Sequence, residues 1–302
     1  MDALRLDQVV KRFGEFVAVD DLSFAVAPGE VFGFLGGNGA GKTTSLRMVL
    51  DILRPDSGQI AVLGRAPGRG NSAMLGFLPE ERGLYRAMTA LDTIVYFGRL
   101  KGMTAADARS GGKTLLERFG LGDFARTPVD KLSKGMAQNI QLATAVINRP
   151  RLLILDEPFS GLDPVNQSLL EDEIVQAARD GAAVVFSTHV MQHAERLCDR
   201  LLLLARGRKL FEGTQDQARD TLPVALHLSA RHSPEGLPGV IRVERTGSDG
   251  AWSDWIVHLA PGGDPGDLLE HCTAQGFALR RFEQRRASLH EAFLHIVGGE
   301  AR

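Results

Sequence analysis

A glycine-rich segment that ends in Lys-Thr-Thr, between residues 36 and 44, carries the most specific chemical pattern in this sequence. It reads Gly-Gly-Asn-Gly-Ala-Gly-Lys-Thr-Thr and fits G-x-x-x-x-G-K-[ST], the pattern of a phosphate-binding loop. An apolar run at 31–35 predicts a buried strand before it, and the apolar spacing over 45–50 predicts a helix after it. A glycine-rich turn that holds Lys-Thr by chance would lack these neighbours, so the sequence predicts a loop that binds a nucleoside triphosphate.

Each residue type in this loop contributes to holding phosphate. Glycines let backbone N–H groups turn toward an anion without a Cβ clash, and the N-terminus of the following helix adds partial positive charge. We expect Lys42 to reach the β- and γ-phosphates and the Thr43 hydroxyl to ligate Mg²⁺. The nucleotide-binding residues predicted in this loop are Gly36, Asn38, Gly39, Ala40, Gly41, Lys42, Thr43 and Thr44.

An apolar strand that ends in two acidic residues is a second candidate. Residues 152–155 read Leu-Leu-Ile-Leu, and Asp156 and Glu157 follow them. In triphosphatases with a phosphate-binding loop, an Asp at this place helps hold Mg²⁺, and a Glu beside it can orient or deprotonate the attacking water. A buried strand capped by two solvated acids would give the same local pattern, so the neighbouring motifs decide between the two.

Further motifs follow in an order that resembles the ATP-binding subunits of ABC transporters. Leu-Ser-Lys-Gly-Met at 132–136 is similar to the family signature LSGGQ, and Ser-Gly-Leu-Asp at 160–163 is similar to the D-loop. His189 stands where the family has its switch histidine. Phe13 stands where an aromatic residue stacks on adenine, and Glu80 where the family has the Q-loop glutamine. The resemblance extends over the chain from residue 4 to about 215.

The resemblance implies a role for each of these residues. A head-to-tail dimer would hold ATP between the phosphate-binding loop of one copy and the Ser133 region of the other. Ser133 and Gly135 would then contact the nucleotide, Phe13 would stack on its base, and Asp163 would link the two sites. The implied catalytic residues are Lys42, Glu157 and His189. The implied Mg²⁺ ligands are Thr43, Glu80 and Asp156.

Single residues of this set also have ordinary structural explanations. Ser133 alone would fit a helix N-cap, Phe13 a core aromatic residue, and His189 a structural histidine. Their shared order and spacing favour the family resemblance instead. The signature departs from the family at Lys134 and Met136, which replace a glycine and a glutamine, but it keeps Ser133 and Gly135.

Residues 77–85 resemble a subgroup of the family. They read Phe-Leu-Pro-Glu-Glu-Arg-Gly-Leu-Tyr and, with the LSKGM signature, resemble the ATP-binding subunits that work with ABC-2-type permeases, including sodium-efflux relatives. Glu80 in this segment replaces a neutral amide with a carboxylate, which can ligate Mg²⁺ but adds negative charge near the phosphates. That subgroup carries a small C-terminal accessory domain, and the end of this chain is similar.

The elements that must position these residues follow from the apolar periodicity. Short apolar segments over 4–35 predict strands and a hairpin, and the helix after the phosphate-binding loop is expected to end near Arg54. Helical spacing over 85–150 predicts a helical subdomain. Continuous apolar runs at 151–156 and 182–187 predict parallel strands that are buried on both faces.

The composition changes after about residue 215. Pro, Gly and short alternating segments appear, and helical spacing returns over 267–275 and 288–297. We therefore divide the chain into an ATP-binding domain at 1–215 and an accessory α+β domain at 216–302 that carries no catalytic group. The predicted fold class is α/β, a P-loop ABC ATPase core with an antiparallel β-subdomain and a helical subdomain, plus the small C-terminal α+β domain.

Composition limits the compartment and the partners. A net charge of −2 over 302 residues gives no reason to expect nucleic-acid binding. Cys198 and Cys272 have no metal-ligand spacing and fit a reducing compartment. The N-terminus has no signal-peptide pattern, and apolar runs of about five to seven residues are too short for a bilayer, which needs roughly 20. We expect a cytoplasmic protein that reaches the inner face of the cell membrane through a permease.

The function implied by the resemblance is ATP hydrolysis that drives a separate ABC-2-type membrane permease, in the direction of export. ATP and Mg²⁺ are the expected cofactors, and a second ATP-binding subunit, in a homodimer, is the expected partner. A soluble ABC ATPase acting on ribosomes or DNA is an alternative, but such relatives carry two cassettes or a long coiled-coil insertion. A nucleotide sensor without turnover is a third class, which the complete set of catalytic residues disfavours.

Overall fold

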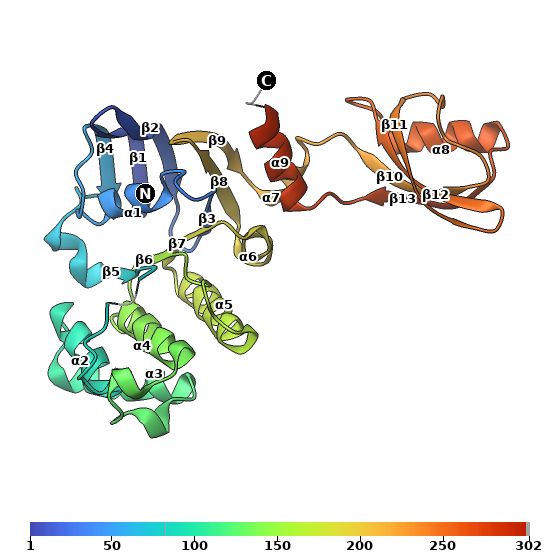
Figure 1. Ribbon diagram of the computed structural model, residues 1–302. Helices are drawn as coiled ribbons and strands as arrows, with labels where there is room; N and C mark the ends of the chain where they lie inside the picture. The colour runs from blue at the N-terminus through green and yellow to red at the C-terminus, as the bar shows by residue number, and fades with distance from the viewer. Residues whose placement is uncertain (82, 300–302) are drawn as a thin grey trace. The chain divides into compact units, whose positions relative to one another are not determined.

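The computed structural model describes residues 1–81 and 83–299. The chain divides into two compact units, one at residues 1–214 and one from residue 215 onward (Figure 1). Two sheets and the helices around them build the first unit, and a third sheet builds the second. Each unit has an apolar core of its own. The candidate site residues all lie in the first unit.

A three-stranded antiparallel sheet carries the N-terminus. It consists of β1 (Leu4–Phe13), β2 (Phe16–Val26) and β4 (Ser57–Val62), with β1 in the middle. Leu4 pairs with Val26 on one side and with Val62 on the other. Phe13 ends β1 at the hairpin to β2, where its ring is 50% exposed.

A six-stranded sheet forms the centre of the first unit. In spatial order it consists of β5 (Leu75–Leu78), β6 (Leu152–Asp156), β7 (Ala183–Thr188), β3 (Val31–Leu35), β8 (Arg200–Ala205) and β9 (Arg208–Gly213). The first five strands are parallel, and β9 pairs antiparallel with β8. Strands β3, β6 and β7 are buried along their whole length. Their carboxyl ends therefore bring the phosphate-binding loop, Asp156 and His189 to one edge of the sheet.

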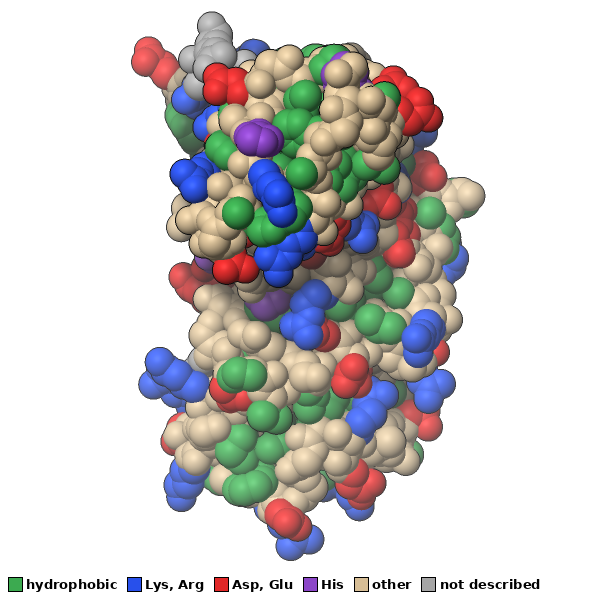
Figure 2. All heavy atoms as spheres, turned by 90° about the vertical axis from the view of Figure 1, so that its right-hand side faces the viewer, with side chains coloured by type: hydrophobic (Ala, Val, Ile, Leu, Met, Phe, Trp, Pro, Cys, Tyr) green, Lys and Arg blue, Asp and Glu red, His purple; other side chains and the backbone are tan. Residues whose placement is uncertain are grey.

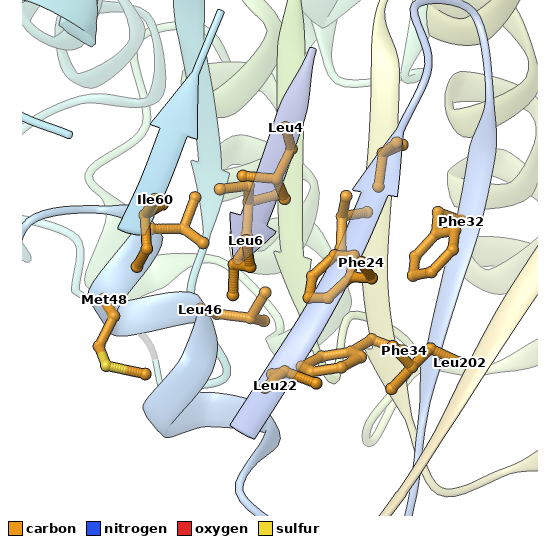
Figure 3. Packing of buried hydrophobic residues seen from close by; sticks show 14 of the residues in the cluster. Leu4, Leu6, Leu22, Phe24, Phe32, Phe34, Leu46, Met48, Ile60 and Leu202 are labelled. Atoms are coloured by element: carbon orange, nitrogen blue, oxygen red, sulfur yellow. The ribbon is translucent and has the colours of Figure 1, made fainter. Parts of the chain in front are cut away.

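Buried side chains join the two sheets to helix α1 (Lys42–Val49) in one apolar cluster (Figure 3). Phe24 of β2 stacks on Phe32 of β3 with the ring centroids 5.4 Å apart. Leu46 and Met48 of α1 are each 1% exposed and belong to the same cluster. This packing fixes both the strand before the phosphate-binding loop and the helix after it.

Helix α1 ends at Val49, so the predicted end near Arg54 was wrong. The N–H group of Ile52 bonds back to the Arg47 carbonyl at 2.9 Å. Asp51 has a φ of 59°, the left-handed conformation with which many helices terminate. Ile52 continued the helical apolar spacing in the sequence, but its side chain is 59% exposed and contributes no packing that would extend the helix.

Five further helices complete the first unit. Between β5 and β6 lie α2 (Ala90–Leu100), α3 (Ala105–Arg118) and α4 (Lys134–Val146), with short 3-10 turns at 122–124 and 129–131. A third such turn, at 69–74, precedes β5. Helices α5 (Pro164–Arg179) and α6 (Met191–Leu197) flank β7 in sequence. The side chains of Thr89, Thr104 and Ser133 each cap one of the first three helices, which explains where those helices begin.

The second unit is a small α+β structure. Its elements are α7 (Gln215–Arg219), β10 (Ala225–Ala230), β11 (Val240–Asp249), β12 (Trp252–Leu259), α8 (Pro265–Ala274), β13 (Leu279–Arg285) and α9 (Leu289–Gly299). The strands form an antiparallel sheet with the order β11-β12-β10-β13. Leu226 and Val257 of the sheet pack with Leu268 and Cys272 of α8.

The predicted fold class is confirmed: the chain is α/β, with a P-loop core, an antiparallel β-sheet and a helical part. In the part of the chain that the structure describes, no helix is long and apolar enough to cross a bilayer. Acidic and basic side chains are interspersed over the face of the molecule in Figure 2. This mixture agrees with the small net charge of −2.

Candidate nucleotide-binding site

The phosphate-binding loop runs from the end of β3 to the start of α1, where its last glycine meets neighbouring backbone. Gly41 has a φ of 107°, and a Cβ at this position would lie 2.5 Å from the Ala18 carbonyl oxygen. Only glycine fits there without a shift of the backbone. Gly41 has no side chain with which to cap α1, so the N–H groups of the first helical turn are oriented to bind an anion.

Lys42 is held inside the loop that it belongs to. Its Nζ donates to the carbonyl oxygens of Gly36 at 2.8 Å and Gly37 at 3.3 Å. The same nitrogen lies 3.2 Å from Glu157 Oε1, and both side chains are below 10% exposed. Contacts with two carbonyl oxygens and one carboxylate thus hold the lysine ammonium group within the loop.

Asp156 lies at the centre of a hydroxyl network. Its Oδ1 accepts a hydrogen bond from Ser187 Oγ at 2.6 Å and one from Thr43 Oγ1 at 3.3 Å. Ser187 Oγ also accepts the backbone N–H of Glu157 at 2.9 Å. The sequence analysis assigned no role to Ser187. Ser187 is the residue of β7 that pairs in register with Asp156 of β6, and the sequence gives no sign of this pairing.

Glu157 connects the lysine to His189. Its Oε2 lies 2.9 Å from His189 Nδ1, whereas its Oε1 makes the ion pair with Lys42 and accepts no hydrogen bond from the described residues. The residue has a φ of 46°, a left-handed backbone that costs a non-glycine residue roughly 1–3 kcal/mol. The His189 side chain is 52% exposed, so this partner of the buried Glu157 carboxylate is accessible to solvent.

The signature segment lies at the start of α4. Ser133 is exposed, and its Oγ accepts the N–H group of Met136 at 3.2 Å as the helix N-cap. Gly135 faces the start of α5: a Cβ there would lie 2.6 Å from Asn166 Nδ2 and 3.5 Å from Asp163 Oδ2. A side chain at position 135 would therefore displace the Asn166 amide from its hydrogen bonds with Asn139 and Asp163.

Asp163 is itself an N-cap, at the start of α5. Its Oδ1 accepts the N–H groups of Val165 and Asn166, each at 3.0 Å. The bonds from Asn166 are the main reason that the pKa of the Asp163 carboxyl lies below its usual range. Asn139 of α4 donates to Asn166 Oδ1 at 2.7 Å, a contact that the sequence analysis missed because neither asparagine belongs to a quoted motif.

Phe13 and Glu80 stand apart from the buried cluster. Phe13 is not a core residue: its ring is half exposed and lies 5.6 Å from Lys11 Nζ. Glu80 is exposed, and its carboxylate makes no hydrogen bond or ion pair with a described residue. The structure therefore brings together Lys42, Thr43, Asp156, Glu157 and His189, and leaves Phe13, Glu80 and Ser133 on the surface.

The groups that face the loop fit a magnesium ion bound with a nucleotide. Within the described ranges, no cluster of three or more His, Cys, Asp or Glu side chains could hold a metal by itself. The Thr43 hydroxyl of the loop and the Asp156 carboxylate share a hydrogen bond, so two oxygen ligands lie together at this place. Mg²⁺ commonly keeps several waters and takes one or two carboxylates plus substrate phosphates, which agrees with this sparse donor set.

Comparisons with known proteins agree with this geometry. A family model described as "ABC transporter" matches residues 19–160. An uncharacterized ABC transporter ATP-binding protein, YhaQ of Bacillus subtilis, is 39% identical over 302 residues, covering 98% of each chain. Nod factor export ATP-binding protein I of Burkholderia lata is 42% identical over 303 residues, covering 97% of this chain and 96% of the relative.

A solved structure agrees with the fold. The ATP-binding subunit of an ABC transporter superimposes with a TM-score of 0.68 at 29% sequence identity. The match covers 72% of this chain and 92% of the solved chain.

Proposed function

This chain belongs to the ATP-binding subunits of ABC transporters, and we propose that it hydrolyses Mg²⁺-bound ATP to drive a separate ABC-2-type membrane permease in export. Relatives named for Nod factor export support the direction of transport. The permease type is supported by the resemblance of residues 77–85 and of the LSKGM signature to that subgroup. Its place in the cell is then the inner face of the cell membrane, where the permease holds it.

The observation that carries hydrolysis is the buried contact of Lys42 with Glu157. Lys42 forms an ion pair with Glu157 Oε1, which accepts no hydrogen bond from the described residues. The other oxygen of this carboxylate, Oε2, pairs with His189. Asp156 lies next to this acid in the chain and bonds to Thr43 of the loop. A phosphate-binding lysine, a magnesium carboxylate and a base are thus assembled at the edge of one sheet.

Nucleotide binding exchanges the partners of Lys42. The β- and γ-phosphates compete with Glu157 and the loop carbonyls for its ammonium group, because they carry more negative charge. Glu157 Oε1 then becomes available to orient the attacking water and accept its proton, while His189 keeps the carboxylate in place through Oε2. Bound Mg²⁺ supplies charge neutralisation on the phosphates. Thr43 and Asp156 would hold it, and Glu80 would join them from its loop.

A second copy of the chain completes the site. Ser133 is exposed and already caps α4, so the positive end of that helix faces outward beside the serine. We assign Ser133 and Gly135 to the nucleotide bound by the partner copy, and Asp163 to the link between the two sites. Phe13 supplies the exposed ring for the adenine base. The second unit of the chain contains none of these groups and acts as an accessory domain.

Two measurements test this function. Purified protein should release phosphate from ATP only with Mg²⁺ present, and it should co-purify from membranes with a multispan permease when both are expressed. Release of phosphate without any membrane partner, together with co-purification of ribosomes or DNA, would favour the soluble alternative. Tight ATP binding without phosphate release would assign the protein to the sensor class.

A further inference from the structure

Gln141 connects helix α4 to the loop that carries Glu80. Its side chain is buried, at 3% exposed. The Nε2 group donates to the Pro79 carbonyl oxygen at 3.3 Å and to the Glu81 carbonyl oxygen at 3.2 Å. These two carbonyls lie immediately before and after Glu80, so one amide group spans the residue from both sides.

The chemistry of the two partners fixes the orientation of this amide. Both are carbonyl oxygens, which only accept, so the NH₂ group must face them and uses both of its hydrogens. Gln141 Oε1 is consequently turned into the protein, where it has no hydrogen-bond partner among the described residues. A buried acceptor without a partner is unfavourable. Because the oxygen gains no bond here, Gln141 stabilises this part of the structure only through the two bonds that its NH₂ group donates to the loop.

The same helix also contacts the first turn of α5. Asn139 Nδ2 donates to Asn166 Oδ1, and Asn166 Nδ2 donates to Asp163 Oδ2 at 2.5 Å. Helix α4 begins at Ser133. Helix α4 thus contacts the loop of Glu80, begins at Ser133, and reaches Asp163 through Asn166, so three residues with proposed roles are linked to one rigid element.

Glu80 depends on this attachment. Its carboxylate is exposed and has no partner among the described residues, so nothing but the backbone fixes where it points. We propose that Gln141 is a positioning residue that anchors the loop of residues 79–81 to α4, so that Glu80 and Ser133 move together. The metal part of this inference rests on the proposed function, because it requires Glu80 to approach a nucleotide-bound Mg²⁺.

The anchor can be tested without nucleotide. Gln141→Met keeps the length of the side chain and removes both donors. Glutamyl endopeptidase should then cut after the exposed Glu80 or Glu81 about fivefold faster than in wild type, because cleavage of a native loop follows its local opening. Mass spectrometry identifies the products. If the methionine variant does not fold, Gln141→Leu also removes both donors and places no ionisable group in the buried position.

Asn148→Leu is the matched control. Asn148 lies just after the end of α4 and donates to the carbonyl oxygens of Ala73 at 2.9 Å and Leu75 at 3.3 Å, so its loss also removes two bonds to backbone. Its Oδ1 also accepts a bond from Lys101 Nζ at 3.0 Å, so the control removes one bond more than Gln141→Met does. Asn148 does not touch the loop of Glu80. We expect its cleavage rate after Glu80 or Glu81 to stay within about twofold of wild type. Equal rates in wild type and Gln141→Met would overturn the anchor.

A magnesium titration tests the functional consequence. In Gln141→Met, the Mg²⁺ concentration for half-maximal phosphate release should rise about fivefold, while nucleotide affinity without metal stays within about twofold. Asn148→Leu should shift neither value. Faster cleavage with an unchanged magnesium curve would support the anchor and remove Glu80 from the metal site. Absence of phosphate release in wild type would contradict the proposed function, and the cleavage rates would still decide the anchor.

Discussion

The two halves of the candidate site differ in how completely this chain builds them. On the phosphate side, Lys42, Asp156 and Glu157 are 6%, 3% and 9% exposed and contact one another or their neighbours directly. In the other half, Ser133 and Glu80 are exposed, as is half of the Phe13 ring. The phosphate half is therefore preformed within the chain. The side chains of the other half are exposed and have few partners.

This difference separates two kinds of requirement. Buried charged groups must be paired within the chain, because an unpaired charge in the interior is strongly unfavourable. Exposed groups meet no such demand, and their partners can come from a nucleotide or from a second copy. Substitutions in the phosphate half should therefore affect turnover or folding, and substitutions in the exposed half should affect binding and metal dependence.

Glu157→Gln should have the largest effect. The amide keeps the shape of the side chain but cannot accept a proton from water, so turnover should fall at least about a hundredfold. ATP binding should persist, since the phosphate-binding loop is unchanged. An ATP-dependent dimer should accumulate, visible by size-exclusion chromatography with ATP and Mg²⁺. Turnover at the wild-type rate would show that Glu157 is not the base, and that the buried half of the site does not carry the chemistry assigned to it.

Ser187→Ala should weaken the phosphate half through folding. The change leaves the Glu157 N–H group without its acceptor and Asp156 Oδ1 without its shortest hydrogen bond, and Ser187 is fully buried. The free energy of unfolding, measured by urea denaturation, should fall by about 1–3 kcal/mol. As a control, Ser168→Ala on the exposed surface of α5 should change it by less than about 0.5 kcal/mol. Equal stability of the two variants would contradict a central role for Ser187.

Phe13→Ala should affect the exposed half through binding alone. Loss of base stacking should weaken ATP binding by about 1–3 kcal/mol in a calorimetric titration. Phe13→Tyr, which keeps the ring, should bind nearly as wild type does. Phe16→Ala is the matched control, because Phe16 pairs with Phe13 across the hairpin and is 63% exposed but has no predicted role. If Phe13→Ala and Phe16→Ala both bind ATP as wild type does, neither ring stacks on the base.

The residues that the structure brings together in the preformed half could be predicted from the sequence, because short local patterns identify them. A glycine loop between a strand and a helix, and an acidic pair that ends an apolar strand, define their own surroundings. Ser187 and Gln141 were not predicted, because each acts on residues that are distant in the chain: Ser187 on the end of β6, and Gln141 on the loop after β5. Strand register and helix packing place those contacts, and neither is readable from one sequence.

The end of α1 shows the same limit at smaller scale. Apolar spacing carried the predicted helix to about Arg54, but a left-handed residue at Asp51 ends it earlier. Periodicity reports which residues could face a core, and the backbone conformation of one residue decides where the helix ends. Ser133 gives the converse case. It is the N-cap of α4, which was the ordinary structural explanation of this residue. It is also exposed at the signature position, so the cap does not exclude contact with a nucleotide.

Glu80→Gln should have the smallest effect, and it tests directly whether the exposed half of the site contacts the metal. The exposed carboxylate has no partner among the described residues, so its removal should leave stability within about 0.5 kcal/mol of wild type. A charged oxygen binds a hard cation more strongly than an amide oxygen does, but it repels the γ-phosphate unless the metal lies between them.

Phosphate release by Glu80→Gln should therefore depend less steeply on Mg²⁺ than release by wild type, and its half-maximal Mg²⁺ concentration should rise about two- to fivefold, because an amide oxygen binds the ion more weakly. Glu81→Gln is the matched control, since it removes an equal charge one residue away on the same exposed loop. A shift common to both variants would report a general change in surface charge. Superimposable curves for wild type and Glu80→Gln would mean that the carboxylate does not reach the metal, and that the exposed half of the site senses the nucleotide through Ser133 and Phe13 instead.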